Sequence, residues 1–309
     1  MKAMLAAAMT LAAVAGGGAS AQPPSRPSIP AVSHLAVYSA DLAKSEHFYV
    51  HDLGGVKLPD PEDANGTRYY FSPTQFVEVL PLPAGDHSIN RLAHTAYVTA
   101  DAEAMRRYLA SKGVAVPKAV STGTDGSKWI EVTDPEGMKV RFVQRSAKSP
   151  VVPVNPLSSH IMHVGFIVHN RANEDKFYKE ILGFRPYWEG GMEDHKPTWI
   201  SLQVPNGRDW LEYMVVGTPD TTGIPAGMSQ ATLGILNHFS LGVPDTRKAY
   251  TLLWNGERLE GQKEAPKIGR DAKWQLNLFD PDGTRAEIME FHAIGKPCCS
   301  PFLAADPEK

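Results

Sequence analysis

The feature that most constrains this chain is an internal duplication. Three pairs of residues are separated by the same 129 positions, namely His34 and His163, Phe48 and Phe177, and Leu53 and Leu182. Three pairs at one offset are difficult to obtain by chance, and a fixed offset is typical of a repeated structural unit. The 309-residue chain is therefore expected to hold two related domains, which its length also suggests.

Each half contains a second, weaker repeat. His94 and His238 open later strand-like runs, and a turn of similar composition follows in each half, at Asp134–Gly137 and Asp280–Gly283. In such turns proline fixes φ and glycine supplies a positive φ. We therefore predict an α+β fold of four βαβββ units. The units are expected at residues 34–82, 94–144, 163–216 and 238–291.

Each unit is expected to contain one helix, because apolar residues recur there at helical spacing. The helices are predicted at residues 41–53, 102–112, 171–182 and 246–254. Gly113 and Gly183 follow two of these segments, and glycine directly after a helix readily adopts the left-handed conformation that ends it.

The N-terminus has the pattern of a secretory signal peptide. Lys2 gives a positive start, residues 4–14 are apolar, and Ala19-Ser20-Ala21 matches a small-residue cleavage site. An uncleaved anchor is the alternative, but the apolar run is shorter than the ~20 residues that a membrane span requires. We expect a periplasmic or secreted protein.

The predicted organisation is a signal peptide at 1–21, a proline-rich leader at 22–32, an N-terminal domain at 33–145, a linker at 146–159, a C-terminal domain at 160–292 and a tail at 293–309.

Composition narrows the range of partners. The formal net charge is -3 and 21% of the residues are charged, which gives no reason to expect nucleic acid or an anionic membrane as a partner. The two cysteines, Cys298 and Cys299, are adjacent and form no disulfide framework. A bond between neighbours spans less than the usual Cα separation, so we expect two tail thiols or an intermolecular pairing.

Strand-opening histidines, the Phe-Tyr and Leu-Gly pairs and the Asp-Pro turns together resemble the vicinal oxygen chelate superfamily. That superfamily groups glyoxalases, bleomycin-resistance proteins and extradiol dioxygenases. The resemblance covers residues 33–292 and implies two glyoxalase-like funnel domains, each built from two βαβββ units. Because both funnels are complete within one chain, we expect a monomer. The resemblance also implies a divalent metal held by the first and last strands of paired units.

The second half matches the metal-binding pattern of the superfamily in full. The residues at the ligand positions are His163, Glu212, His238 and Glu287. In the first half, His34, Glu78 and His94 are present, but Arg141 stands at the position of Glu287. We interpret the first half as mainly structural, with Arg141 pairing with Glu78. An anion-binding role for Arg141 is the alternative.

Strand parity supports the assignment independently of the resemblance. Alternate strand residues face opposite sides, and beside each of the four ligand positions the opposite face carries apolar residues, as at Val164, Leu211, Phe239 and Ala286. The four polar side chains are therefore expected on the face away from the helices. Glu290 falls on the other face, so Glu287 is preferred. A single strand histidine is more often structural than a ligand, but agreement of four positions favours a metal site.

Two imidazoles and two carboxylates suit Fe, Mn, Ni, Co or Zn. Such an ion polarises a substrate oxygen, and Glu212 or Glu287 is the candidate general base. Trp188, Trp199, Trp210, Tyr213 and Trp274 either line the funnel mouth or belong to the core.

The favoured function is a metal-dependent lyase, isomerase or dioxygenase-like enzyme acting on a small oxygenated molecule. Extradiol ring cleavage is disfavoured, because residues 276–279 lack the tyrosine of that branch and no histidine lies between His238 and Glu287. Lactoylglutathione chemistry fits the ligand set, but glutathione is chiefly cytosolic and the chain has an export signal. The alternative is a non-catalytic small-molecule-binding protein of the bleomycin-resistance type.

Overall fold

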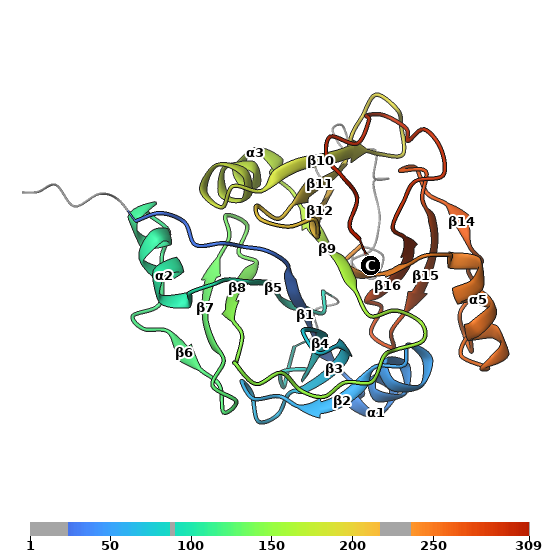
Figure 1. Cartoon of the computed structure of the whole chain (residues 1–309), viewed down its shortest axis with the longest axis horizontal. Coiled ribbons are helices and arrows are strands. Elements are labelled where there is room, and N and C mark those ends of the chain that lie inside the picture. The colour runs from blue at the N-terminus through green and yellow to red at the C-terminus, as the bar shows by residue number, and fades with distance from the viewer. Residues whose placement is uncertain (1–23, 87–89, 217–235, 309) are drawn as a thin grey trace, which may run out of the picture.

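The computed structural model describes residues 24–86, 90–216 and 236–308. Two curled eight-stranded sheets lie next to each other, with short helices at their edges (Figure 1). The expected signal peptide at 1–21 lies outside the described residues.

The first sheet comes entirely from the first half of the chain. Its strand order is β2-β3-β4-β1-β5-β8-β7-β6. The strands are β1 (Val32–Ser39), β2 (Val56–Pro59), β3 (Thr67–Ser72), β4 (Gln75–Pro81), β5 (Leu92–Val98), β6 (Ser121–Thr122), β7 (Lys128–Thr133) and β8 (Lys139–Gln144).

The second sheet repeats this order with strands of the second half, β10-β11-β12-β9-β13-β16-β15-β14. Its strands are β9 (Ile161–Val168), β10 (Arg185–Gly190), β11 (Trp199–Gln203), β12 (Trp210–Val215), β13 (His238–Val243), β14 (Lys267–Ile268), β15 (Trp274–Phe279) and β16 (Arg285–Glu290). In each unit the first strand runs parallel to the last, as in β9 with β12 and β13 with β16. The prediction of an α+β fold with four βαβββ units in two domains is confirmed.

The helices begin where the sequence predicts. They are α1 (Leu42–Glu46) with its π-helical continuation η1 (His47–Asp52), α2 (Ala102–Ser111), α3 (Arg171–Asp175) with η2 (Lys176–Ile181), and α5 (Thr246–Asn255). The side chains of Asp41, Asp101, Asn170 and Asp245 accept a hydrogen bond from the backbone N–H three residues later. This N-cap satisfies a donor that the helix itself cannot pair.

One hydrophobic core joins the two halves. The rings of Tyr49 and Phe239 lie 6.3 Å apart and those of Tyr97 and Phe184 lie 5.1 Å apart. Both pairs connect a residue of one half with a residue of the other, and all four side chains are buried. The duplicated domains therefore share packing instead of forming two separate cores.

The Asp-Pro turns reinforce this junction reciprocally. The Tyr49 hydroxyl donates to Asp280 Oδ2 at 2.9 Å, and the Tyr178 hydroxyl donates to Asp134 Oδ2 at 3.3 Å. Each turn thus contacts the helix of the opposite half. Since the helices and the shared core occupy one side of each sheet, the opposite, concave side is left for polar side chains.

The C-terminal segment folds back onto the second sheet. Leu303 N donates to Tyr187 O at 2.8 Å, and Gln203 Nε2 donates to Ala305 O at 2.7 Å. These contacts join the segment to β10 and β11, so it covers one end of the second domain (Figure 1).

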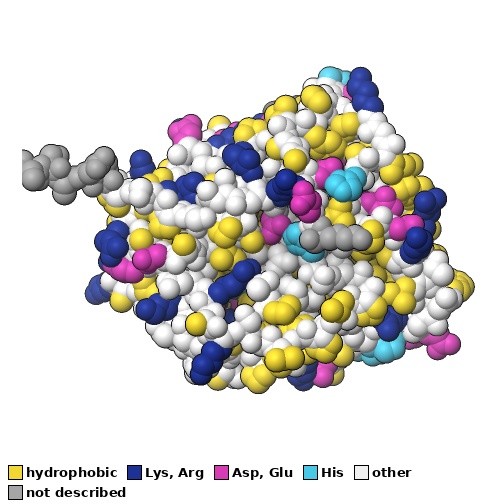
Figure 2. All heavy atoms as spheres, viewed as in Figure 1, with side chains coloured by type: hydrophobic (Ala, Val, Ile, Leu, Met, Phe, Trp, Pro, Cys, Tyr) yellow, Lys and Arg dark blue, Asp and Glu magenta, His cyan; other side chains and the backbone are white. Residues whose placement is uncertain are grey.

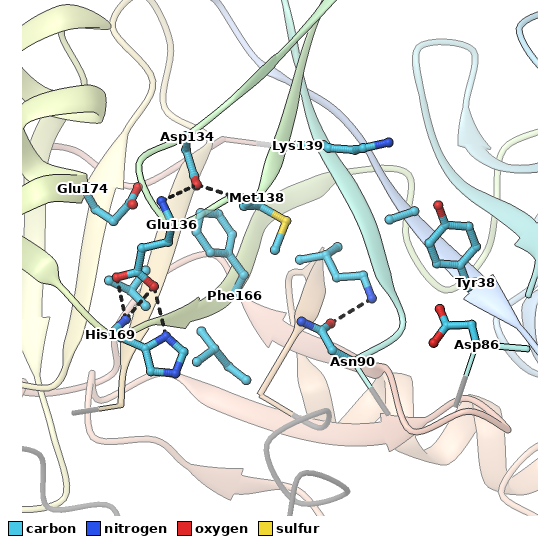
Figure 3. A pocket seen from close by; sticks show the side chains of 15 residues that line it. Tyr38, Asp86, Asn90, Asp134, Glu136, Met138, Lys139, Phe166, His169 and Glu174 are labelled. Carbon is cyan, nitrogen blue, oxygen red and sulfur yellow. Dashed lines mark hydrogen bonds and ion pairs between the residues drawn. The ribbon is translucent and has the colours of Figure 1, made fainter. Parts of the chain in front are cut away.

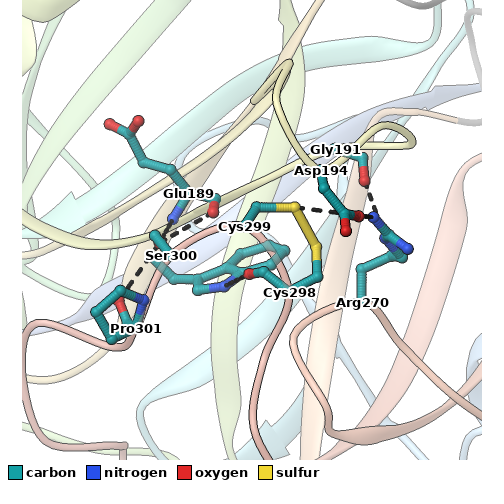
Figure 4. Close-up of a disulfide and its surroundings, with 9 residues drawn as sticks. Glu189, Gly191, Asp194, Arg270, Cys298, Cys299, Ser300 and Pro301 are labelled. Carbon is teal, nitrogen blue, oxygen red and sulfur yellow. Dashed lines mark hydrogen bonds and ion pairs between the residues drawn. A yellow bond between two sulfur atoms is a disulfide. The ribbon is translucent and has the colours of Figure 1, made fainter.

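The expectation for the cysteines was wrong. Cys298 and Cys299 form a disulfide with each other, with their Cα atoms 3.8 Å apart (Figure 4). Two hydrogen bonds hold Cys298 in place. Cys298 N donates to Arg270 O at 2.8 Å, and Trp188 Nε1 donates to Cys298 O at 3.3 Å. The expectation rested on the usual Cα separation of bridged cysteines, which this pair falls below.

Candidate metal centre

The four predicted ligands of the second half come together on the four central strands of their sheet. His163 lies on β9, Glu212 on β12, His238 on β13 and Glu287 on β16, and these strands are neighbours. The two Nε2 atoms are 3.0 Å apart. His163 Nε2 lies 3.2 Å from Glu287 Oε2, and His238 Nε2 lies 3.2 Å from Glu212 Oε2. We call this set of four the second centre.

Gly165 makes room for the second centre. It is the register partner of both Glu212 and His238, so these residues lie in one row across three strands. A Cβ atom at Gly165 would lie 2.0 Å from His238 Cε1, far inside van der Waals contact. The sequence interpretation missed this role, although the glycine two residues after His163 was visible, and Ala36 stands at the matching place in the first half.

Two further residues adjoin His163. The Trp210 ring stacks on the imidazole with centroids 4.4 Å apart, because the two residues are register partners. Ser240 lies between His163 and Glu287 in register. Its buried hydroxyl has no hydrogen-bond partner among the described residues. Trp210 thus lines the centre, whereas Tyr213 packs in the main core.

The hydrogen bonding of His238 fixes its tautomer. His238 Nδ1 lies 2.7 Å from Leu236 O, and a carbonyl oxygen only accepts, so Nδ1 carries the proton. Burial lowers the pKa of His238, which keeps the ring neutral. Nε2 therefore presents a lone pair to His163 and Glu212. Backbone contacts of this kind orient imidazoles that ligate metals.

The carboxylate of Glu287 is ionised at neutral pH. Burial, the largest single effect, opposes ionisation, but the charge of Arg285 together with the adjacent imidazoles of His163 and His238 outweighs it, and the pKa of Glu287 falls to about 2. Glu287 Oε2 makes no hydrogen bond with a described residue. A buried carboxylate oxygen without a hydrogen-bond partner costs free energy even where a nearby charge stabilises the ionised form. A divalent cation between the side chains would accept the lone pair of His238 Nε2 and the charge of the carboxylates, so the residues fit a metal.

The competing residues lie elsewhere. Glu290 Oε1 accepts a hydrogen bond from Thr246 N at the start of α5, on the helix side of the sheet. His160 Nε2 lies 2.8 Å from Asp209 Oδ1. Glu290 and His160 thus each have a partner outside the second centre.

The C-terminal segment approaches the second centre through Lys273. This fully buried residue donates from Nζ to Asp306 Oδ1 at 2.8 Å and to Phe291 O at 2.7 Å. The ammonium also lies 5.2 Å from the centroid of the Trp210 ring, which stacks on His163. The C-terminal segment is therefore connected to the second centre through the side chains of Lys273 and Trp210.

The corresponding residues of the first half also converge. His34 Nε2 and His94 Nε2 are 2.9 Å apart, and each lies 3.3 Å from Glu78 Oε2. Arg141 forms the predicted pair with Glu78, at 3.8 Å. It lies closer to two carboxylates that the sequence interpretation did not include, Glu131 at 2.9 Å and Glu62 at 3.0 Å.

An open cleft lies at the junction of the halves and not at either centre. Its volume is about 460 Å³, and Figure 3 shows the side chains of Asp134, Glu136, His169 and Glu174 on one side of it. Glu136 accepts hydrogen bonds from His169 N at 2.8 Å. The cleft is lined by none of the four residues of the second centre.

The surface carries charges of both signs. On the face shown in Figure 2, basic and acidic side chains are interspersed and form no patch of one sign. Among the described residues, none of the helices has the length and apolar character to cross a membrane.

Comparison with known proteins agrees with this architecture. The family model described as the Glyoxalase/Bleomycin resistance protein/Dioxygenase superfamily matches residues 31–142 and 160–288. The chain belongs to this superfamily. The two matched ranges coincide with the two halves of the duplication, which confirms the predicted resemblance. No curated protein is significantly similar to the chain in sequence.

Solved structures in this superfamily share the fold across most of the chain. A Mn(II)-bound glyoxalase from Novosphingobium aromaticivorans aligns with a TM-score of 0.62 and 15% identity, covering 85% of this chain and 83% of that one. Homoprotocatechuate 2,3-dioxygenase from Brevibacterium fuscum aligns with a TM-score of 0.62 and 17% identity, covering 90% and 86%. A catechol 2,3-dioxygenase gives 0.61 and 14%, covering 91% and 92%. At these levels of sequence identity, the comparison shows that this chain shares the fold of the three proteins and nothing further.

Proposed function

We propose that the protein is an exported, divalent-metal-dependent enzyme that acts on a small oxygenated molecule at the second centre. The observation that carries the proposal is the inward-facing lone pair of His238 Nε2, 3.0 Å from His163 Nε2 and 3.2 Å from Glu212 Oε2. Hydrogen bonds cannot satisfy all of these contacts together, whereas one cation can. Fe, Mn, Ni, Co and Zn each suit this mixture of nitrogen and oxygen ligands.

The exposure of the four side chains distinguishes the residues that hold the metal from the one that reacts with substrate. The side chains of His163, His238 and Glu287 are 1%, 0% and 4% exposed, and that of Glu212 is 15% exposed. When bound, the metal supplies Lewis acidity toward a carbonyl or enediolate oxygen. His163, His238 and Glu287 hold it. Glu212, the most exposed of the four, accepts the substrate proton, and Ser201 Oγ lies 3.5 Å from Glu212 Oε1.

The residues near the centre favour proton-transfer chemistry over ring cleavage. Asn277 on β15 is the register partner of Glu287, in the stretch before the Asp-Pro turn where the extradiol branch places a tyrosine. The asparagine amide donates to Glu264 Oε2 at 3.1 Å and has no titrating proton near neutral pH. We therefore favour a lyase or isomerase reaction. If the N-terminal signal exports the chain, the substrate is unlike cytosolic glutathione conjugates.

A binding protein of the bleomycin-resistance type is the second candidate. It is favoured by the closed state of the second centre, three of whose side chains are almost fully buried, and by the junction cleft, which lies away from the centre. In this case the protein would hold a ligand without reaction and without a stoichiometric metal.

The two candidates are separated by metal content and proton exchange. The protein is reconstituted with Mn²⁺, Fe²⁺, Ni²⁺, Co²⁺ or Zn²⁺, and exchange of the α-proton of small hydroxycarbonyl compounds is followed by NMR in D₂O. We expect exchange that depends on the metal and is lost in Glu287→Gln but kept in Glu290→Gln, a matched variant on the same strand. The enzyme proposal fails if the second centre takes up no metal in any reconstitution.

A further inference from the structure

The first half contains a buried triad that its assigned structural role does not explain. His34 on β1, Glu78 on β4 and His94 on β5 lie on three adjacent strands. They are 0%, 0% and 1% exposed. The distances between the two Nε2 atoms and Glu78 Oε2 are 2.9, 3.3 and 3.3 Å, so three potential ligand atoms form a closed triangle.

With Glu78 as a carboxylate, no placement of protons on the two Nε2 atoms satisfies this triangle. If both Nε2 atoms carry protons, two donors face each other across 2.9 Å. If one does, the other histidine presents a lone pair to Glu78 across 3.3 Å. If neither does, all three contacts join acceptors. Both oxygens of Glu78 also make no hydrogen bond with a described residue, and a buried acceptor without a partner costs about 1–3 kcal/mol.

The charged groups around the triad include more carboxyl groups than guanidinium groups. Arg68 pairs with Asp60 at 2.9 Å and with Glu62 at 2.7 Å. Arg141 pairs with Glu62 and Glu131, as described above. With Glu78, two guanidinium groups thus face four carboxylates. A divalent ion at the triad would be the shared partner of the three inward-facing atoms.

We propose that the first half holds a second, structural divalent metal ion at His34, Glu78 and His94. Two imidazoles and one carboxylate suit a borderline ion such as Zn²⁺, Fe²⁺ or Mn²⁺. Arg141 takes the place of a fourth protein ligand, and its guanidinium is held by Glu62 and Glu131. Because the triad is closed to solvent, the ion stabilises the domain and does not meet substrate.

This inference is tested without altering the first half. The full chain carrying His163→Asn and His238→Asn is reconstituted with Co²⁺ or Zn²⁺, desalted, and its metal content measured. We expect about one metal per chain, against about two for the unaltered protein. The Co²⁺ form should show visible d–d absorption, and a strong chelator should lower the melting temperature of the variant.

The matched variant, His34→Asn with His94→Asn, separates the two proposals. It should retain one metal, held by the second centre. The inference is overturned if the His163/His238 variant retains no metal while remaining folded by circular dichroism. If that variant keeps its metal and the His34/His94 variant has none, the first-half site stands and the proposed function fails.

Discussion

His238 Nδ1 lies 2.7 Å from the carbonyl oxygen of Leu236, and this contact determines which ring nitrogen faces the second centre. Leu236 stands just before β13, so the backbone that leads into the strand orients the imidazole. The lone pair of Nε2 is thereby directed toward His163 and Glu212 before any metal arrives. A ligand oriented in this way loses less conformational freedom on binding.

Adding a methyl group at Gly165 should weaken metal binding at the second centre. The new Cβ would lie 2.0 Å from His238 Cε1, so Gly165→Ala forces the ring away from its position. We expect at least a tenfold loss of affinity, or about 1.4 kcal/mol, in a Co²⁺ titration. Ala36→Gly at the matching place of the first half is the control and should leave the second centre unchanged. Normal affinity in Gly165→Ala would show that the ring position does not matter.

Removing Asp306 should destabilise the protein more than removing Lys273. Asp306→Asn leaves the fully buried ammonium of Lys273 without its carboxylate partner, at a cost of about 3 kcal/mol. Lys273→Met replaces the charge with an apolar side chain and leaves Asp306 21% exposed to solvent. Urea unfolding measures both free energies, and the double variant should resemble Lys273→Met. The opposite order of the single variants would contradict this account.

Glu174 should make stability fall as pH rises. It is fully buried without a hydrogen-bond partner among the described residues. Burial, followed by the charges of Asp134 and Glu136, raises its pKa from 4.5 to about 9. The folded state therefore keeps the proton while the unfolded chain releases it, so the stability present below pH 4.5 is lost progressively up to about pH 9.

The test is Glu174→Gln, which removes the titrating group. We expect its melting temperature to equal that of the unaltered protein near pH 5 and to exceed it by on the order of 5 °C at pH 8.5. Glu180→Gln, an exposed position on the continuation of the same helix, is the control. A difference independent of pH would mean that Glu174 is ionised in the folded protein.

The sequence predicts the duplicated fold well because its signals are local and repeated. Strand parity placed Glu287 with the histidines and Glu290 toward α5, since side chains alternate along a strand. The offset of 129 positions then located the same unit twice. The helices followed from apolar residues at helical spacing, and the ends of two of them from the glycines that come directly after.

What the sequence did not predict depends on contacts between distant segments. The clearance that Gly165 gives His238 appears only once β9 and β13 are paired. Lys273 reads as an ordinary surface residue until Asp306 packs against it, 33 positions away. The carboxylates around Arg141 likewise come from distant segments, Glu62 from a loop and Glu131 from the neighbouring strand β7. No repeat in the sequence indicates that they lie near Arg141.

The most direct measurement for the central claim is an anomalous-difference map from a crystal of the protein reconstituted with Zn²⁺, collected at the zinc absorption edge. The account predicts a peak on the concave side of the second sheet, about 2.0–2.1 Å from His163 Nε2 and His238 Nε2 and in contact with Glu287. A map with no peak among His163, Glu212, His238 and Glu287, despite full reconstitution, would contradict it.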